Sequence, residues 1–87
     1  MYGQVHVNFV LYWGRPTTGA RFRQIVVVEL EQFQVRILDG EVIQTEPQFT
    51  ANNPDAIYEL HPGLQSALAD ADKEYSASMQ AGWIPYA

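Results

Sequence analysis

The residues best suited to bind a ligand are gathered in one short stretch near the start of the chain. Two aromatic rings, two hydroxyls and three guanidinium groups follow one another there: Tyr12, Trp13, Arg15, Thr17, Thr18, Arg21 and Arg23. Arginine can grip phosphate or carboxylate through paired hydrogen bonds, and an aromatic ring can stack on a base. The stretch therefore predicts a site for a small anionic, nucleotide-like ligand. Two alternatives stay open: contact with a protein partner, or arginines that pair with the chain's own Glu29, Glu31 or Glu41.

Patterns for catalysis or metal binding are weaker. The chain has no cysteine and no Gly-x-Ser-x-Gly motif, which leaves only His6 and His61 as candidate bases. Two histidines without a thiol do not predict a dedicated zinc site. Residues 70–75 imitate the opening of a calcium loop, but Tyr75 occupies the position that needs glycine. We therefore expect no enzyme activity, no metal and no cofactor.

The composition indicates one small acidic domain over residues 1–87. A chain of this length is too short to split its core in two. Residues 1–28 carry three arginines and no acid, whereas residues 29–87 carry ten acids, one arginine and one lysine, so charges of +3 and −8 give the net −5. This distribution argues against duplex nucleic acid, whose phosphates need a broad basic face. The apolar run over 9–13 is too short for a membrane span, so we expect a cytoplasmic protein that binds no membrane.

The spacing of apolar residues predicts an antiparallel sheet of three to four strands. Apolar side chains alternate from Gln4 to Trp13 and again from Arg21 to Leu30, with the period of a strand. The pair Asp39-Gly40 suits the positive φ angles of a tight hairpin turn. We accordingly expect a hairpin whose strands cover residues 33–38 and 41–45.

Helices are predicted in the second half of the chain. Asn53-Pro54-Asp55 is typical of a helix start, and a short helix would end before Pro62. Apolar residues at helical spacing predict a long helix from Leu64 to Ala81, with Gly82 as its cap. A helix over 21–38 is the alternative to the central strands, although three consecutive valines favour a strand. The expected fold is α+β, in the order ββββαα, with the long C-terminal helix packed on one sheet face.

Oligomer contacts are predicted in the C-terminal part. The outer side of the long helix has small residues around Lys73, including Ala69 and Ala77, which would let a second helix approach closely. Trp83 and Tyr86 are large apolar side chains that we expect to dock, either on the chain's own sheet or on a partner subunit. These five residues are the predicted oligomer contacts.

Both faces of the predicted sheet carry apolar residues, and one helix covers only one of them. Val10, Tyr12, Ile25 and Val27 are assigned to the second face, which then needs a partner. The leading hypothesis is a small, acidic, non-enzymatic binding protein that acts through protein contacts, as a homo-oligomeric inhibitor or adaptor. The alternative is a small-molecule binder that sequesters or senses an anionic ligand at the arginine-rich loop.

Overall fold

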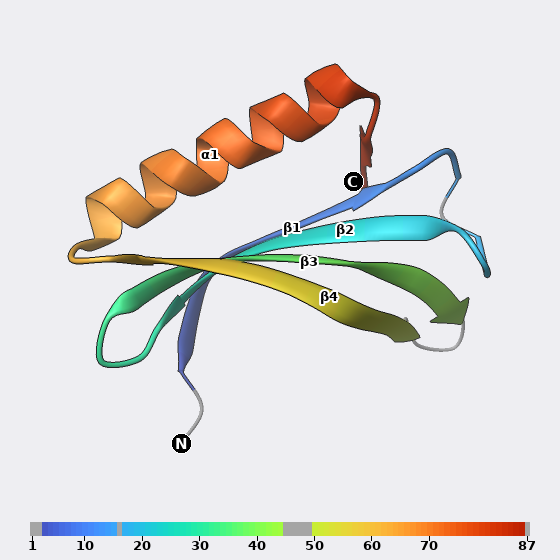
Figure 1. Cartoon of the computed structure of the whole chain (residues 1–87). Coiled ribbons are helices and arrows are strands. Elements are labelled where there is room, and N and C mark those ends of the chain that lie inside the picture. The colour runs from blue at the N-terminus through green and yellow to red at the C-terminus, as the bar shows by residue number, and fades with distance from the viewer. Residues whose placement is uncertain (1–2, 16, 45–49, 87) are drawn as a thin grey trace.

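The computed structural model describes residues 3–15, 17–44 and 50–86, and these residues form a five-stranded antiparallel sheet with one α-helix across it (Figure 1). The elements in chain order are β1 (Gln4–Tyr12), β2 (Arg21–Glu29), β3 (Phe33–Gln44), β4 (Thr50–His61), α1 (Leu64–Ala81) and β5 (Ile84–Pro85). Their order across the sheet is β4-β3-β2-β1-β5. The α+β class and the helix on one face are confirmed. The order is ββββαβ rather than ββββαα.

The first two predicted strands are confirmed as β1 and β2, so the alternative helix over 21–38 does not form. The predicted hairpin at Asp39-Gly40 is wrong, because β3 continues through both residues as one strand of 12 residues. Asp39 pairs with Arg23 and Gly40 with Phe22 across the β2–β3 ladder. The continuous ladder along β2 outweighs the local turn preference of the pair. Gly40 is not among the described glycines with a positive φ angle.

The predicted short helix at Asn53 is also wrong. The segment Thr50–His61 forms β4, which pairs antiparallel with β3. β4 lies at the edge of the sheet, and its ladder with β3 shifts register between the pairs Asp39–Asp55 and Glu41–Asn52, which flank Pro54. Edge strands and such irregularities tolerate proline, which has no N–H to donate to a ladder. The helix-start pattern therefore lies in a strand, because this segment pairs with β3.

The long helix is confirmed from Leu64 to Ala81. Gly82 ends it at a φ of 115°, and its amide donates to the Met79 carbonyl. A β-carbon at Gly82 would lie 3.2 Å from the Trp13 ring, so both backbone geometry and close packing favour glycine here. Small buried residues, Ala67 and Ala71, let α1 lie close to the sheet.

The strand register assigns the sheet faces differently from the prediction. Phe9 pairs with Ile25 and Val7 with Val27, so Ile25 and Val27 lie under α1 with the buried Leu11. A shift of one residue in register moves every side chain to the other face. Sequence alternation gives the period of each strand but not its register with the neighbouring strand, which is why Ile25 and Val27 were assigned to the wrong face.

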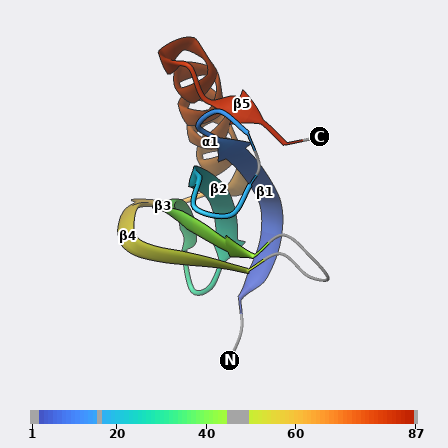
Figure 2. The same ribbon diagram turned by 90° about the vertical axis from the view of Figure 1, so that its right-hand side faces the viewer.

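The face away from α1 has a small core of its own. Tyr12, Phe22 and Val42 are buried there, with Val10 and Ala20 packed around them. Figure 2 shows how strongly the sheet twists, so that β3 and β4 run at an angle to β1. The part of this face around Tyr12 is therefore filled by the chain itself and is not an open surface.

The C-terminal segment docks on its own sheet, which confirms one of the two predicted alternatives. β5 pairs with the end of β1, Leu11 opposite Pro85 and Tyr12 opposite Ile84. The Tyr86 amide donates to the Val10 carbonyl at 2.8 Å. In the part of the chain that the structure describes, no helix is long and apolar enough to cross a membrane.

Candidate functional sites

The predicted ligand-binding residues divide into three groups in the structure. Trp13, Arg15, Thr17, Thr18 and Arg21 are exposed, Arg23 is partly buried, and Tyr12 is buried in the second core. The backbone brings Trp13, Arg21 and Arg23 together at the C-terminal end of α1. Arg15, Thr17 and Thr18 lie in the exposed loop between β1 and β2.

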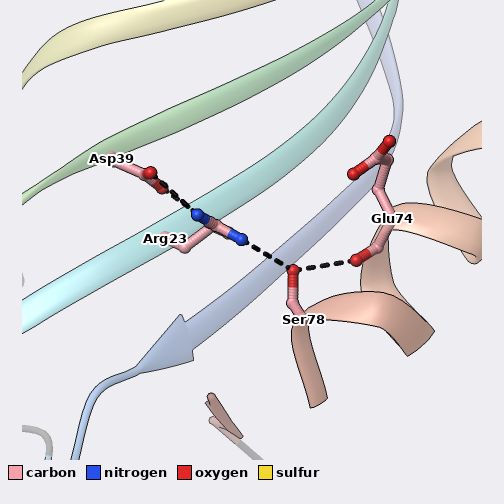
Figure 3. Close-up of polar contacts among 4 residues, drawn as sticks. All are labelled: Arg23, Asp39, Glu74 and Ser78. Carbon is pink, nitrogen blue, oxygen red and sulfur yellow. Dashed lines mark hydrogen bonds and ion pairs between the residues drawn. The ribbon is translucent and has the colours of Figure 1, made fainter. Parts of the chain in front are cut away.

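Arg23 is held by a network within the chain (Figure 3). Its Nε and Nη2 donate to the two carboxylate oxygens of Asp39 at 2.7 and 2.9 Å, and its Nη1 donates to the Ser78 hydroxyl at 3.0 Å. Ser78 in turn donates to the Glu74 carbonyl at 2.8 Å. The side-chain hydrogen bonds to Asp39 raise the pKa of Arg23. The network joins β2, β3 and α1, and it is the kind of internal pairing that one alternative anticipated, with Asp39 in place of the glutamates.

Trp83 lies against both arginines of β2. The Arg23 Cζ is 4.6 Å and the Arg21 Cζ 5.5 Å from its ring, within the range of a cation–π contact. The Trp13 ring meets it edge to face, with ring centroids 5.3 Å apart. Trp83 therefore packs against Trp13 and both arginines within the chain itself.

We expect Asp39→Asn to lower the free energy of unfolding by about 1.5 kcal/mol. Hydrogen bonds to a charged group are worth about 1.5–3 kcal/mol, and the lower value applies because both side chains are partly exposed. Urea denaturation measures this change. Glu41→Gln is the matched control, since Glu41 stands opposite the exposed Arg21 and forms no side-chain hydrogen bond with another described residue. We expect a loss below about 0.5 kcal/mol. Equal losses for the two variants would contradict the structural role of the Arg23–Asp39 pair.

The burial of Tyr12 leads us to expect a loss of stability at alkaline pH. Burial raises the pKa of its phenol above the usual 10.0, and the nearby Tyr86 raises this pKa further. The folded state therefore holds this proton more tightly than the unfolded state, so the associated stability is complete below pH 10 and falls as the pH rises through the folded pKa. Tyr12→Phe should reduce the fall that begins near pH 10, measured by urea denaturation at about pH 8 and at a series of pH values above 10. An equal fall in both proteins would contradict the assignment.

The two histidines have different surroundings. His6 on β1 lies 2.8 Å from a carboxylate oxygen of Glu29. His61 at the end of β4 lies 3.2 Å from the Ser66 hydroxyl and 3.0 Å from a carboxylate oxygen of Asp70. The sequence does not reveal Asp70 as the partner of His61, because the two become neighbours only when α1 folds back on β4.

The C-terminal part of β4 carries the most exposed large apolar side chains of the described sheet. Ile57, Tyr58 and Leu60 are 72%, 65% and 57% exposed. Leu60 also lines a shallow hollow of about 350 Å³ with Leu30 and Gln34. None of these residues was predicted as a contact, because the sequence there suggested a helix. Recognising Pro54 as an edge-strand proline would have been the available signal.

The predicted oligomer contacts lie in different environments. Ala69, Lys73 and Ala77 are exposed on the outer side of α1, and Tyr86 is exposed beside β1. Trp83, only 6% exposed, belongs to the core under α1. Three of the five thus share one accessible helix surface.

No protein-family model, curated protein or solved structure matches this chain. The function is therefore argued from the surfaces and side-chain clusters described above.

Proposed function

We propose that this protein is a non-enzymatic binding protein that acts through protein contacts, and that its contact surface is the outer edge of β4. The observation that carries the proposal is the group Ile57, Tyr58 and Leu60, which is exposed on an edge strand of 12 residues, with Tyr58 and Leu60 on one face and Ile57 on the other. An open edge presents unpaired backbone N–H and C=O groups to another strand. Exposed apolar side chains next to that edge add the area that a stable contact buries.

The opposite edge of the sheet, formed by β1 and β5, is less suited to such a contact. β5 covers the end of β1 at Leu11 and Tyr12, and the rest of that edge carries one largely exposed apolar residue, Val5. On β4, by contrast, the segment from Ile57 to His61 contains three exposed apolar side chains and one acid, Glu59. Side-chain area therefore favours β4 over β1.

The partner on β4 is proposed to be a second copy of the chain. Antiparallel pairing of β4 with β4 uses the same surface on both copies, which is the geometry of a two-fold dimer. It would join two sheets edge to edge and leave the outer side of α1 free. We propose that this acidic homodimer acts as an inhibitor or adaptor on a basic target surface, since opposite fields favour association.

Sedimentation equilibrium across about 1–200 µM protein tests self-association, because weak specific contacts have dissociation constants in this range. We expect the mean mass to rise from one chain to two. A mass of one chain throughout this range would overturn the homodimer.

The anionic-ligand alternative has support from one observation. Arg15 and Arg21 are exposed, and within the described residues neither forms a recorded ion pair. Arg23, the third arginine of that prediction, is already bound to Asp39. A melting temperature that rises with inorganic phosphate in the wild type but not in Arg21→Ala would favour the alternative.

A further inference from the structure

A cluster of metal-ligand groups lies where β4 meets the first turns of α1. Glu59 and His61 come from the end of β4, and Asp70 comes from α1. One ligand atom from each of the three lies within 4.8 Å of the others. His61 and Asp70 are partly buried, while Glu59 is exposed. Glu59 and His61 belong to the same end of β4 as the proposed contact surface, on the face of the strand that also carries Ile57.

The hydrogen bonds of Ser66 fix the orientation of the His61 ring. The Ser66 hydroxyl donates its proton to the Gly63 carbonyl at 3.1 Å. The same oxygen lies 3.2 Å from the His61 Nδ1, within hydrogen-bond distance of that nitrogen. When Ser66 accepts from Nδ1 in a neutral imidazole, the other nitrogen, Nε2, carries the lone pair that a metal ion needs.

The other ring nitrogen of His61, Nε2, faces a carboxylate. Nε2 lies 3.0 Å from the Asp70 carboxylate oxygen. An ionised carboxylate can only accept hydrogen bonds, so the two atoms attract each other only when a proton or a cation stands between them. A histidine that gives one ring N–H to a fixed acceptor and turns the other nitrogen towards carboxylates has the arrangement of a metal ligand with its supporting partner.

We propose that Glu59, His61 and Asp70 bind a divalent metal ion of the zinc class. One imidazole nitrogen and two carboxylate oxygens suit zinc, whereas calcium and magnesium prefer oxygen ligands alone. Three protein ligands leave the fourth position of a tetrahedral ion to solvent. Ser66 is the positioning residue that holds the His61 ring.

The distances fit such an ion after a small movement of one side chain. With metal–ligand bonds of about 2.0–2.2 Å, a tetrahedral ion holds its donor atoms roughly 3.3 Å apart. The His61 and Asp70 atoms, at 3.0 Å, are already near that separation. Within the 4.8 Å limit of the cluster, the exposed Glu59 carboxylate has to move by at most about 1.5 Å. The bound ion would tie the end of β4 to α1.

Isothermal titration of the chelator-treated full chain with zinc chloride, at about pH 7.5, tests the proposal. We expect one zinc ion per chain and a higher melting temperature with zinc. His61→Ala should abolish the binding, and Ser66→Ala should weaken it about tenfold, the usual loss for a supporting partner. His6→Gln is the matched control, because His6 faces a single carboxylate, Glu29, and should leave the affinity unchanged.

Glu59→Gln separates loss of the site from loss of the fold. Glu59 is exposed, so the melting temperature without zinc should stay the same, while the zinc affinity falls at least about tenfold. An unchanged affinity in Glu59→Gln would overturn the three-ligand site. Zinc binding that persists in His61→Ala, or its absence in the wild type, would show that His61 and Asp70 form an ordinary ion pair and would overturn the proposal.

Discussion

Leu60→Lys is expected to weaken self-association at least about 100-fold, equivalent to about 2.7 kcal/mol of binding free energy. The change places a charge among apolar side chains that the contact would bury, and lysine on an edge strand is a common natural block against edge pairing. Because Leu60 is 57% exposed in the monomer, the free energy of unfolding of the variant should differ from that of the wild type by less than about 0.5 kcal/mol. The variant therefore separates association from folding.

Val5→Lys is the matched control for the edge experiment. Val5 is 56% exposed and lies on β1, whose outer edge beyond the β5 pairing is the other open edge of the described sheet. Sedimentation of both variants should show weak association only for Leu60→Lys. If Val5→Lys weakens association and Leu60→Lys does not, the contact lies on β1 and the assignment to β4 is wrong.

Trp83→Ala is expected to lower the free energy of unfolding by about 3–5 kcal/mol. Trp83 is 6% exposed, belongs to the core under α1, and holds both Arg21 and Arg23 against its ring. A domain of 87 residues is typically stable by about 4–13 kcal/mol, so the variant should lose much of its stability. Urea denaturation followed by circular dichroism measures the loss.

Ile84→Ala is the control for the tail. Ile84 is the next residue, lies in β5 and is 52% exposed, so its truncation should lower the free energy of unfolding by less than about 1 kcal/mol. A loss below about 1 kcal/mol for Trp83→Ala as well would show that the tail is not part of the core, contrary to the packing described here.

The sequence predicted the elements whose signals are local. Leu64 to Ala81 has helical spacing and ends at Gly82, and both features act within a few residues of the chain. The alternation in β1 and β2 is also local. These elements could be predicted because no distant partner is needed to choose between helix and strand.

The wrong predictions concern segments whose secondary structure is determined by pairing with strands far along the chain. Asp39-Gly40 is a good turn by itself, but Arg23 and Phe22 on β2 hold it in a continuous ladder. Asn53-Pro54-Asp55 is a good helix start by itself, but β3 offers an edge along which this segment pairs. In both cases contacts far along the chain outweigh a local preference worth about 1 kcal/mol.

The candidate sites follow the same division. The arginine cluster was visible because its members are close in sequence, yet the partners that fix Arg23, namely Asp39 and Ser78, come from β3 and α1. Asp70 joins His61 through the packing of α1 on β4. The exposed edge of β4 could not be predicted from the sequence, because the edge position of a strand depends on the strand order of the sheet.

The central claim, that β4 is the contact edge, is tested most directly by amide hydrogen exchange at low and high protein concentration. The β4 amides from Ile57 to His61 that do not bond to β3 should exchange rapidly in dilute protein and become protected as the concentration rises. The amides along Gln4 to Phe9 of β1 should exchange at the same rate at both concentrations. Exchange at β4 that does not depend on concentration, or new protection confined to β1 or α1, would contradict the account.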